Sequence, residues 1–292
     1  MKKILIHAHI FYEEMWPRLA SCIGNVDQKY DLYVTVPKNR PALFSLVSTS
    51  FPQAKIVCCE NRGYDIAPFI EVLNQVNLDD YSYIIKIHTK RDMDSNFILN
   101  GFNLSGGRWR EKLLSFISHR ESFKAALEYF HKHPKVGMLT DKELIFDVDK
   151  YGALDSSAYP EQKQFIKQHG WKYRPYYFVA GAMFIARAQC FRKLQGILSP
   201  ADFPMANSGH TSQLAHVVER VIGYAVYNEG YIIDFVGSRK EHIMWNYGTK
   251  NVKIRLHRIG RFFYQKKLTK SGRLLIKIAK IPVFSYKRTQ SA

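Results

Sequence analysis

Polar side chains gather directly after two apolar runs in the first third of the chain. The run Ile56–Cys59 ends at Glu60-Asn61-Arg62-Gly63-Tyr64-Asp65, and the run Tyr81–Ile87 ends at His88-Thr89-Lys90-Arg91. Cationic and imidazole side chains can bind phosphate oxygens, and a carboxylate accepts hydrogen bonds from hydroxyl groups. Ligands of open α/β sheets bind outside the carboxyl ends of the strands, so we expect both loops to face one pocket. The residues expected to line it are Asn61, Arg62, Asp65, His88 and Lys90.

A helix is predicted to begin directly after the first loop. Residues Ile66–Val76 carry apolar side chains at helical spacing, with Pro68 in the first turn, where a missing N–H costs little. Gly63 can adopt a positive φ and bring the backbone close to a ligand. Asp65 has two interpretations, as a hydrogen-bond acceptor for a base or ribose hydroxyl of a bound ligand or for Arg62, and as the N-cap of this helix.

Apolar runs and helical patterns alternate along the chain. Strands are predicted over Lys3–Ile10, Tyr30–Val36, Ile56–Cys59, Tyr81–Ile87, Val136–Leu139 and Tyr231–Phe235, with a strand pair broken at Gly181 over Tyr176–Ala186. Helices are predicted over Glu13–Ile23, Arg40–Ser48, Ile66–Val76, Trp109–Ser118, Glu121–His131 and Ser212–Val221. The segment Asp141–Trp171 receives no assignment. This alternation predicts an α/β fold with a parallel sheet covered by helices.

The composition is that of a globular protein. Of the 292 residues, 46% are hydrophobic and 14% are aromatic, enough for one large α/β domain or two small ones. No run of about 18 apolar residues occurs, so a membrane-spanning helix is not predicted. His7 and His9 interrupt the apolar start of the chain, which we interpret as a first strand rather than a secretion signal. Cys58 and Cys59 are adjacent, and the absence of paired cysteine spacing favours a reducing cytoplasm without disulfides.

Positive charge is concentrated at the C-terminus. The net charge is +18, and residues 242–292 contain thirteen lysines and arginines but no acidic residue. Basic side chains alternate there with apolar ones such as Phe262, Phe263 and Leu274. This pattern is typical of an amphipathic segment on an anionic membrane leaflet, where each basic residue contributes about 1 kcal/mol. Basic and aromatic residues together also bind nucleic acid, but no nucleic-acid motif occurs elsewhere, so we expect no nucleic-acid partner.

Four further residues have both a binding and a structural interpretation. His7 and His9 point to one face of the first strand, and without a third ligand nearby hydrogen-bonded histidines are favoured over a metal site. Trp109 and Arg110 follow the polar loop Asp92–Gly107, which we interpret as a lid or an acceptor-side loop. Both can bind acceptor or donor, or the tryptophan can pack in the core.

Gly181 lies between two alanines within an apolar segment. A glycine at such a position permits a close backbone approach to a ligand, or it reflects ordinary strand packing.

Six motifs follow one another along residues 1 to 236. They are His7-Ala8-His9-Ile10-Phe11-Tyr12, Asn61-Arg62-Gly63-Tyr64-Asp65-Ile66-Ala67-Pro68-Phe69, Lys86-Ile87-His88-Thr89-Lys90, Trp109-Arg110, Ala180-Gly181-Ala182-Met183-Phe184 with Ala186-Arg187, and His216-Val217-Val218-Glu219-Arg220. In sequence and order they resemble the rhamnan synthesis F family.

The resemblance implies a sugar transferase of bacterial cell-surface polysaccharide assembly, such as that of lipopolysaccharide. Its donor would be a nucleotide-sugar, with a deoxyhexose such as dTDP-rhamnose favoured, and its acceptor a glycan or lipid-linked glycan. The implied fold is of the GT-A type, and the implied reaction is inverting. Residues 1–240 would form this domain, and the basic segment 241–292 would hold the protein on the inner, cytoplasmic face of the bacterial membrane.

For the catalytic base, the resemblance points to Glu219 on a late helix. His216 lies one turn earlier, so the two side chains share a helix face, and Arg220 is adjacent. The alternative is a solvated charge on a helix surface.

Glycosyl transfer also needs a group that stabilises the leaving diphosphate. Many GT-A enzymes carry an Asp-x-Asp pair after the strand that ends here at Ile87, but this chain has His88-Thr89-Lys90 instead. Lys90 and Arg91 can neutralise the diphosphate directly while His88 donates a hydrogen bond, so no metal cofactor is firmly implied. Asp92 and Asp94 form a weaker alternative that would bind Mg²⁺ or Mn²⁺.

A second class of function stays open on the sequence alone. The chain can be a non-catalytic glycan- or nucleotide-binding module of a larger polysaccharide assembly complex. Only an enzyme would release nucleoside diphosphate in proportion to acceptor.

Overall fold

The computed structural model describes residues 2–92, 98–99, 102–148, 159–205, 213–247, 263–268, 273–278 and 281–287. Contacts within the chain divide it into two units. The first unit comprises residues 1–92 and 107–236, and the second comprises residues 93–106 and 237–292.

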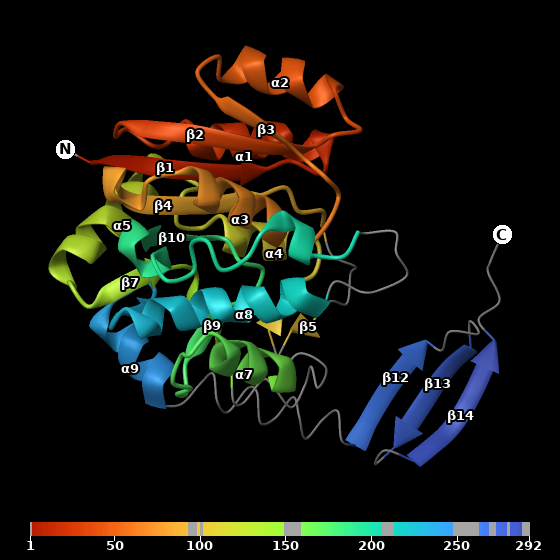
Figure 1. The fold of residues 1–292 in the computed structure, drawn as a ribbon. Coiled ribbons are helices and arrows are strands. Elements are labelled where there is room, and N and C mark those ends of the chain that lie inside the picture. Colours follow the sequence, from red (N-terminus) through yellow and green to blue (C-terminus); the bar gives the residue numbers. More distant parts are fainter. Residues whose placement is uncertain are drawn as a thin grey trace. The chain divides into compact units, whose positions relative to one another are not determined.

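A seven-stranded sheet forms the centre of the first unit (Figure 1). Its strands are, in spatial order, β11 (Ile232–Asp234), β7 (Val136–Leu139), β10 (Phe184–Arg187), β4 (Tyr81–His88), β1 (Lys3–His9), β2 (Tyr30–Pro37) and β3 (Lys55–Cys59). Strand β10 runs antiparallel to both of its neighbours, and the other pairs are parallel. The predicted α/β fold is therefore confirmed. The predicted parallel sheet contains one antiparallel strand, β10, and the GT-A type stays a prediction.

Helices flank this sheet. They are α1 (Trp16–Ile23), α2 (Ala42–Ser50), α3 (Ile66–Gln75), α4 (Arg108–Leu113), α5 (Arg120–Lys132), α7 (Tyr159–Gln168) and α8 (Gln213–Asn228), with the short 3₁₀ turns η1 (Glu13–Met15), η2 (Leu78–Asp80), η3 (Lys142–Leu144), η4 (Ala188–Phe191) and η5 (Pro200–Asp202). From β1 the chain passes through α1 to β2, toward the β3 edge of the sheet. From β3 it passes through α3 in the opposite direction, across β2 and β1, to β4. Right-handed crossovers therefore place α1 and α3 on opposite faces, and Figure 1 shows α3 in front of the sheet and α1 behind it.

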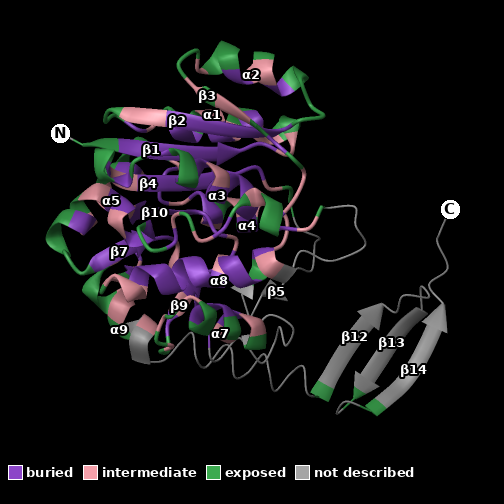
Figure 2. Cartoon of the chain, in the orientation of Figure 1, coloured by how far each residue is buried: buried purple, intermediate pink, exposed green. Residues whose placement is uncertain are grey.

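The central strands are buried on both faces, as the purple core in Figure 2 shows. In β1 six successive residues, Ile4 to His9, are buried, which is why this strand reads as a nearly continuous apolar run. The polar exceptions in the core of the sheet include His7, Thr35 and Lys86. Because a buried polar group costs free energy unless it is hydrogen-bonded, each of these side chains needs a partner.

The segment Tyr176–Ala186 forms two strands interrupted at Gly181, as predicted. The strands belong to different sheets, because β9 (Tyr177–Val179) pairs with β8 (Ile145–Asp147) and β10 joins the main sheet. Gly181 and Ala182 both adopt positive φ, 82° and 46°, and this turn redirects the chain between the two sheets. The helix predicted over Trp109–Ser118 ends at Leu113, and the helix predicted to end at Val221 continues to Asn228.

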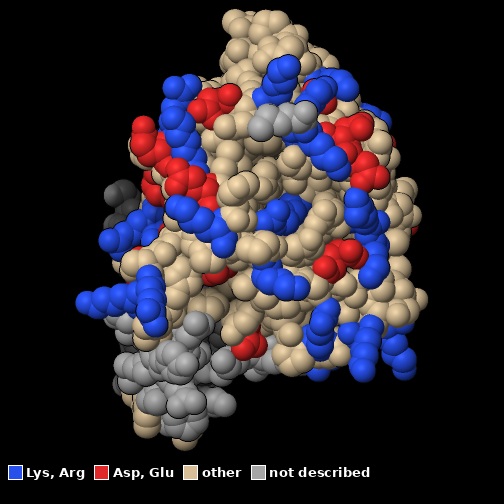
Figure 3. Space-filling view, turned by 90° about the vertical axis from the view of Figure 1, so that its left-hand side faces the viewer, with Lys and Arg blue, Asp and Glu red and all other residues tan. Residues whose placement is uncertain are grey.

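Charges of both signs are interspersed on the face that carries the amino-terminal ends of the parallel strands. Figure 3 views the left-hand side of Figure 1, where β1 begins, and shows Lys and Arg side chains next to Asp and Glu. The carboxyl ends of the strands lie on the opposite side, so the predicted phosphate-binding loops are remote from this mixed surface.

The second unit contains the elements β5 (Ile98–Leu99), β6 (Phe102–Asn103), α9 (Arg239–Tyr247), β12 (Tyr264–Leu268), β13 (Arg273–Ile278) and β14 (Ile281–Lys287). The last three strands form an antiparallel sheet in the order β12-β13-β14. The basic C-terminal segment thus includes regular β-structure. Among the described residues, none of the helices has the length and apolar character needed to cross a membrane.

Candidate active site

A pocket of about 500 Å³ opens at the carboxyl ends of β1 and β4. These two strands are neighbours, but the chain leaves β1 toward β2 and reaches β4 from the other direction, so the pocket lies where the strand order reverses. This is the usual ligand-binding position of an open α/β sheet. The residues that line it are His9, Phe11, Tyr12, Asn61, Tyr64, Asp65, Ile66, His88, Thr89, Lys90, Gly181, Ala182, Ala215, His216 and Glu219.

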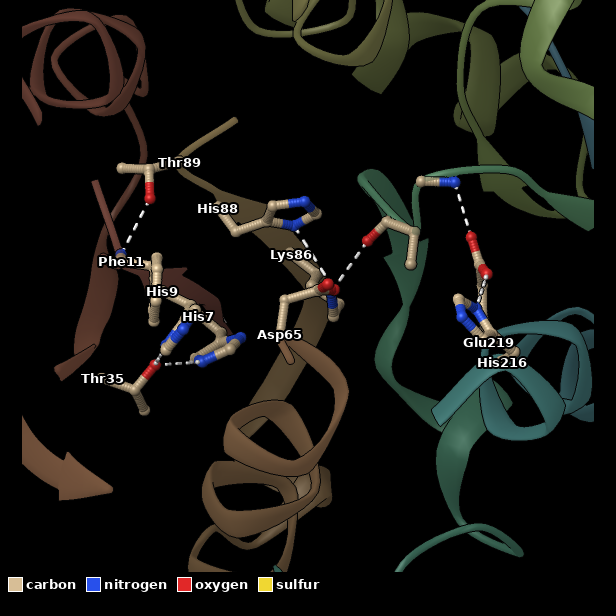
Figure 4. Close-up of polar contacts among 12 residues, drawn as sticks. His7, His9, Phe11, Thr35, Asp65, Lys86, His88, Thr89, His216 and Glu219 are labelled. Atoms are coloured by element: carbon tan, nitrogen blue, oxygen red, sulfur yellow. Dashed lines mark hydrogen bonds and ion pairs between the residues drawn. The ribbon is translucent and has the colours of Figure 1, made fainter. Parts of the chain in front are cut away.

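Asp65 is held at the floor of this pocket by a buried lysine (Figure 4). The Nζ atom of Lys86 donates a hydrogen bond to Asp65 Oδ2 at 2.5 Å and another to the Ala182 carbonyl oxygen at 3.0 Å. The Lys86 side chain is 0% exposed. His88 Nδ1 lies 3.4 Å from the same Asp65 oxygen. Asp65 is therefore fixed by contacts from β4, although it lies at the start of α3.

The electrostatics of this cluster favour an ionised carboxylate beside neutral histidines. Burial alone would raise the pKa of Asp65, but attraction to His88 and Lys86, with the Lys86 hydrogen bond, holds that pKa below its usual range. Burial lowers the pKa of His88 to about 3 and that of His9 to about 4. At neutral pH both histidines are consequently uncharged and can donate or accept hydrogen bonds.

His7 and His9 share one hydroxyl group. His7 Nε2 lies 2.9 Å and His9 Nδ1 lies 3.0 Å from Thr35 Oγ1 on the neighbouring strand β2. His7 also packs against the Phe69 ring at 5.6 Å and faces the core, whereas His9 reaches the pocket. Of the two interpretations of these histidines, the structure supports hydrogen-bonded side chains in the core and on the pocket floor. Within the described ranges, no three His, Cys, Asp or Glu side chains are grouped as a metal site requires.

Glu219 and His216 project into the pocket from α8, on the side opposite Asp65 (Figure 4). Glu219 Oε1 accepts a hydrogen bond from the backbone N–H of Gly181 at 2.6 Å. Its other oxygen, Oε2, lies 3.8 Å from His216 Nδ1. The Glu219 side chain is 19% exposed and that of His216 is 50% exposed. The carboxylate is thus oriented by the backbone and still reaches the cavity.

Two turns with left-handed backbone flank the cavity. Gly63 and Tyr64 have φ of 60° and 55°, and Gly181 and Ala182 have φ of 82° and 46°. Positive φ is costly for Tyr64 and Ala182, and strain of this kind is concentrated at functional sites. A Cβ on Gly181 would lie 2.7 Å from Leu113 Cδ2. The glycine therefore allows the turn to pack closely against Leu113, and it also lines the pocket.

Lys90 is the pocket residue best placed to meet an anion. It follows β4, lines the cavity and is half-buried. The described part of the structure gives it neither a hydrogen bond nor an ion pair. Next to it, Thr89 Oγ1 accepts hydrogen bonds from the backbone N–H groups of Phe11 and Tyr12 at 2.8 and 3.0 Å. The two loops that follow β1 and β4 are thereby joined at the pocket edge.

Three of the predicted arginines are directed elsewhere. Arg62 donates to the carbonyl oxygens of Ala201 and Phe203 at 3.1 and 3.2 Å and pairs with Glu60 at 2.6 Å, so it braces the pocket loop from outside. Arg91 pairs with Glu14 at 2.8 Å. Arg220 donates to the carbonyl oxygen of His216 at 2.7 Å and stacks on Phe178.

The cavity lining also excludes four other predicted residues, Trp109, Arg110, Asp92 and Gly63. Trp109 is buried and packs beside Gly181, in agreement with its structural interpretation. Arg110 forms an ion pair with Asp92, whose carboxylate is therefore already engaged. Asp94, the second member of the alternative metal pair, lies outside the described residues. Gly63 gives the first loop its left-handed turn but does not line the cavity.

Several residues that line the pocket or lie directly behind it were not predicted from the sequence. Lys86 stands in the middle of the apolar run Ile84-Ile85-Lys86-Ile87, and a lysine at such a position signals a buried charge that needs a partner. Phe11 and Tyr12 form an aromatic pair directly after a strand, which is a signal for a ligand-facing loop. Tyr64 lies within the predicted loop, 51% exposed, with its ring 5.8 Å from that of His216.

Comparison with known proteins agrees with the resemblance of the motifs. Residues 1–231 match the model of a family described as rhamnan synthesis protein F. Two relatives, both named "Uncharacterized protein WxcX", come from Xanthomonas campestris pv. campestris, strains B100 and ATCC 33913. Each is 26% identical over 187 residues, which make up 63% of this chain and 25% of the relative. The aligned part of the chain thus spans about a quarter of the length of these relatives.

Proposed function

The chain belongs to the rhamnan synthesis protein F family, and from this premise we propose that it transfers a sugar from a nucleotide-sugar donor to a glycan or lipid-linked glycan. Membership connects the chain with polysaccharide synthesis. The transfer reaction, an inverting course and a deoxyhexose donor such as dTDP-rhamnose are our proposal.

The observation that carries the proposal is the placement of Glu219 and Lys90 in one cavity. In the proposed reaction, Glu219 Oε2 takes the proton of the acceptor hydroxyl as its oxygen forms a bond to the anomeric carbon of the donor. The bond from that carbon to the diphosphate oxygen breaks, and the electron pair leaves with the diphosphate. Lys90 stabilises the charge that develops there.

The structure gives Glu219 and Asp65 different environments, and this favours Glu219 as the base. Asp65 Oδ2 accepts a hydrogen bond from a buried ammonium group, which stabilises the carboxylate and weakens it as a proton acceptor. Glu219 is bound by a neutral backbone N–H through one oxygen only. We assign Asp65 to hydrogen bonds with hydroxyl groups of the sugar.

The proposal assigns the diphosphate to Lys90 rather than to a metal held by Asp92 and Asp94. Asp92 already pairs with Arg110, so binding a cation there would compete with that ion pair. Mg²⁺ or Mn²⁺ would act by neutralising the diphosphate if Asp92 were released.

A membrane surface is proposed as a further partner. The thirteen basic residues of the segment 242–292, with no acidic residue among them, favour contact with an anionic leaflet, where a lipid-linked acceptor would be located.

A second candidate function is supported by the length of the relatives. The aligned part of the chain corresponds to only about a quarter of each relative's length. The chain can therefore be a glycan- or nucleotide-binding module of a larger assembly.

The experiment that separates the two functions measures release of nucleoside diphosphate. The purified chain is incubated with dTDP-rhamnose, UDP-sugars or GDP-sugars, with and without a rhamnose-containing glycan acceptor. A transferase releases the nucleotide in proportion to acceptor consumed. A binding module shifts the thermal unfolding midpoint with nucleotide or glycan but releases nothing.

A further inference from the structure

Lys86 is an unusual residue for the centre of a sheet. It stands on β4 between His7 of β1 and Phe184 of β10, and its side chain is fully buried. A buried ammonium group costs free energy unless it is paired, and apolar residues of similar volume often replace buried ion pairs without loss of stability. Sheet packing alone therefore gives no reason for a lysine here.

The contacts of Lys86 join the two sides of the pocket. Its Nζ atom bonds Asp65, which precedes α3, and the carbonyl oxygen of Ala182, in the turn before β10. The preceding residue in that turn, Gly181, donates its N–H to Glu219 of α8. One lysine thus connects the carboxylate on the floor with the turn that orients the carboxylate on the opposite wall (Figure 4).

Lys86 does not line the cavity, so it can act only through the groups that it holds. Asp65 Oδ2 accepts the hydrogen bond of Lys86 and lies 3.4 Å from His88 Nδ1, whereas Oδ1 has no hydrogen-bond partner among the described residues. That oxygen is left to accept a hydroxyl group of a bound sugar.

On the basis of this geometry, and resting on the proposed transfer reaction, we propose that Lys86 is a positioning residue. It fixes the Asp65 carboxylate for hydrogen bonding to the sugar and braces the Gly181–Ala182 turn that orients Glu219. An effect of Lys86 on the reaction is consequently transmitted mainly through Asp65.

A double-mutant cycle tests this transmission. We expect Lys86→Met and Asp65→Asn each to lower kcat/KM about 100-fold, as a misplaced positioning group can. The variant carrying both changes should lie within about threefold of Asp65→Asn alone, because coupled residues are not additive. This double variant also removes the unpaired charge that threatens the folding of Lys86→Met. A double variant about 100-fold below Asp65→Asn would overturn the proposal.

The pH dependence supplies a readout that a packing role would not change. The charged and titratable groups next to Asp65 are Lys86 and His88 on β4 and His7 and His9 on β1, while His216 and Glu219 of α8 lie across the cavity. Without Lys86, burial is less opposed and the pKa of Asp65 rises, so kcat/KM of Lys86→Met should recover as the pH is raised. A uniform loss at every pH would contradict a positioning role.

A measurement without substrate separates this inference from the proposed function. In protein labelled at the aspartate carboxyl carbons, the NMR signal absent from Asp65→Asn should titrate at higher pH in Lys86→Met than in the wild type. An unchanged titration would overturn the inference even if transfer occurs. If the wild type transfers no sugar while the titration shifts as expected, the proposed function is wrong but the effect of Lys86 on Asp65 is confirmed.

Lys112→Met serves as the matched control. Lys112 also pairs with an aspartate, Asp141 at 3.2 Å, but does not line the pocket. Its kcat/KM should stay within about threefold of the wild type, as expected for a site independent of the reaction.

Discussion

The backbone N–H of Gly181 donates a hydrogen bond to Glu219 Oε1 at 2.6 Å, which joins the left-handed turn before β10 to helix α8. Because residue 181 is a glycine, this turn can adopt φ of 82° and pack closely against Leu113 and Trp109 of α4. The orientation of the proposed base therefore depends on the backbone conformation of a separate segment, and this dependence can be measured.

Gly181→Ala should destabilise the fold more than Gly196→Ala. Both glycines have similar positive φ, 82° and 78°, but a Cβ has open space at Gly196 and would lie 2.7 Å from Leu113 at Gly181. The backbone strain common to both should cost about 1 kcal/mol, and crowding at Gly181 should cost about 1–3 kcal/mol more. Urea unfolding measures both free energies. Equal losses would show that the turn relaxes and that the close approach is not required.

Acid should destabilise the protein between about pH 6.5 and pH 4 through its buried histidines. Burial lowers the pKa of His9 to about 4 and of His88 to about 3, and keeps the pKa of His7 well below its usual value. In this window the unfolded chain binds protons that the folded chain does not, so the free energy of unfolding falls as the pH decreases. Each histidine contributes a slope of about 1.4 kcal/mol per pH unit. Below about pH 4 the lowered pKa of Asp65 acts in the same direction.

Urea unfolding at a series of pH values measures this slope. His9→Gln should reduce it by up to about 1.4 kcal/mol per pH unit, whereas His131→Gln, at an exposed position of α5, serves as the control. A pH-independent free energy of unfolding between pH 6.5 and 4 would contradict the assignment of neutral buried histidines.

Lys90→Ala should weaken binding of the nucleoside diphosphate. A charge-assisted hydrogen bond contributes about 1.5–3 kcal/mol, so Kd should rise at least about 10-fold. Isothermal titration with the nucleotide found active measures the change. Lys124→Ala removes a surface lysine that lies near Asp27, and it should leave Kd unchanged. Unchanged Kd in Lys90→Ala would place the diphosphate elsewhere.

Replacing Lys266 and Lys267 with Gln in the full chain should weaken binding to anionic vesicles. Two charges at about 1 kcal/mol each correspond to a loss of about 30-fold. Cosedimentation with phosphatidylglycerol vesicles measures it, with phosphatidylcholine vesicles as reference and Gln at Lys124 and Lys132 as control. Equal binding by both variants would show that the basic segment is not the membrane contact.

Much of the sheet could be predicted because its strands carry strong local patterns. The apolar runs of β1, β2 and β4 match the observed strands closely, since burial on both faces leaves a continuous apolar signal. The polar residues at the ends of predicted strands also indicated where the pocket lies, because His9, His88 and Lys90 all line it.

The less predictable features depend on tertiary contacts. Nothing local distinguishes Arg62, which turns to carbonyl oxygens near Phe203, from an arginine that faces the pocket. Strands β9 and β10 read as one segment, but their sheet membership is decided by partners 30 or more residues away. The sequence shows Lys86 as a lysine among isoleucines. Its two acceptors, Asp65 and Ala182, could not be predicted because they lie on segments that only the fold brings together.

The most direct test of the account is the acceptor-dependent release of nucleoside diphosphate by wild type and Glu219→Gln. Glutamine keeps an oxygen for the Gly181 N–H but cannot take a proton, so thermal unfolding should be preserved while kcat falls about 10²- to 10⁴-fold. Glu229→Gln, just beyond the same helix and paired with Lys193, should retain activity. Activity near the wild-type level in a folded Glu219→Gln protein would contradict the assignment of Glu219 as the base of the transfer reaction.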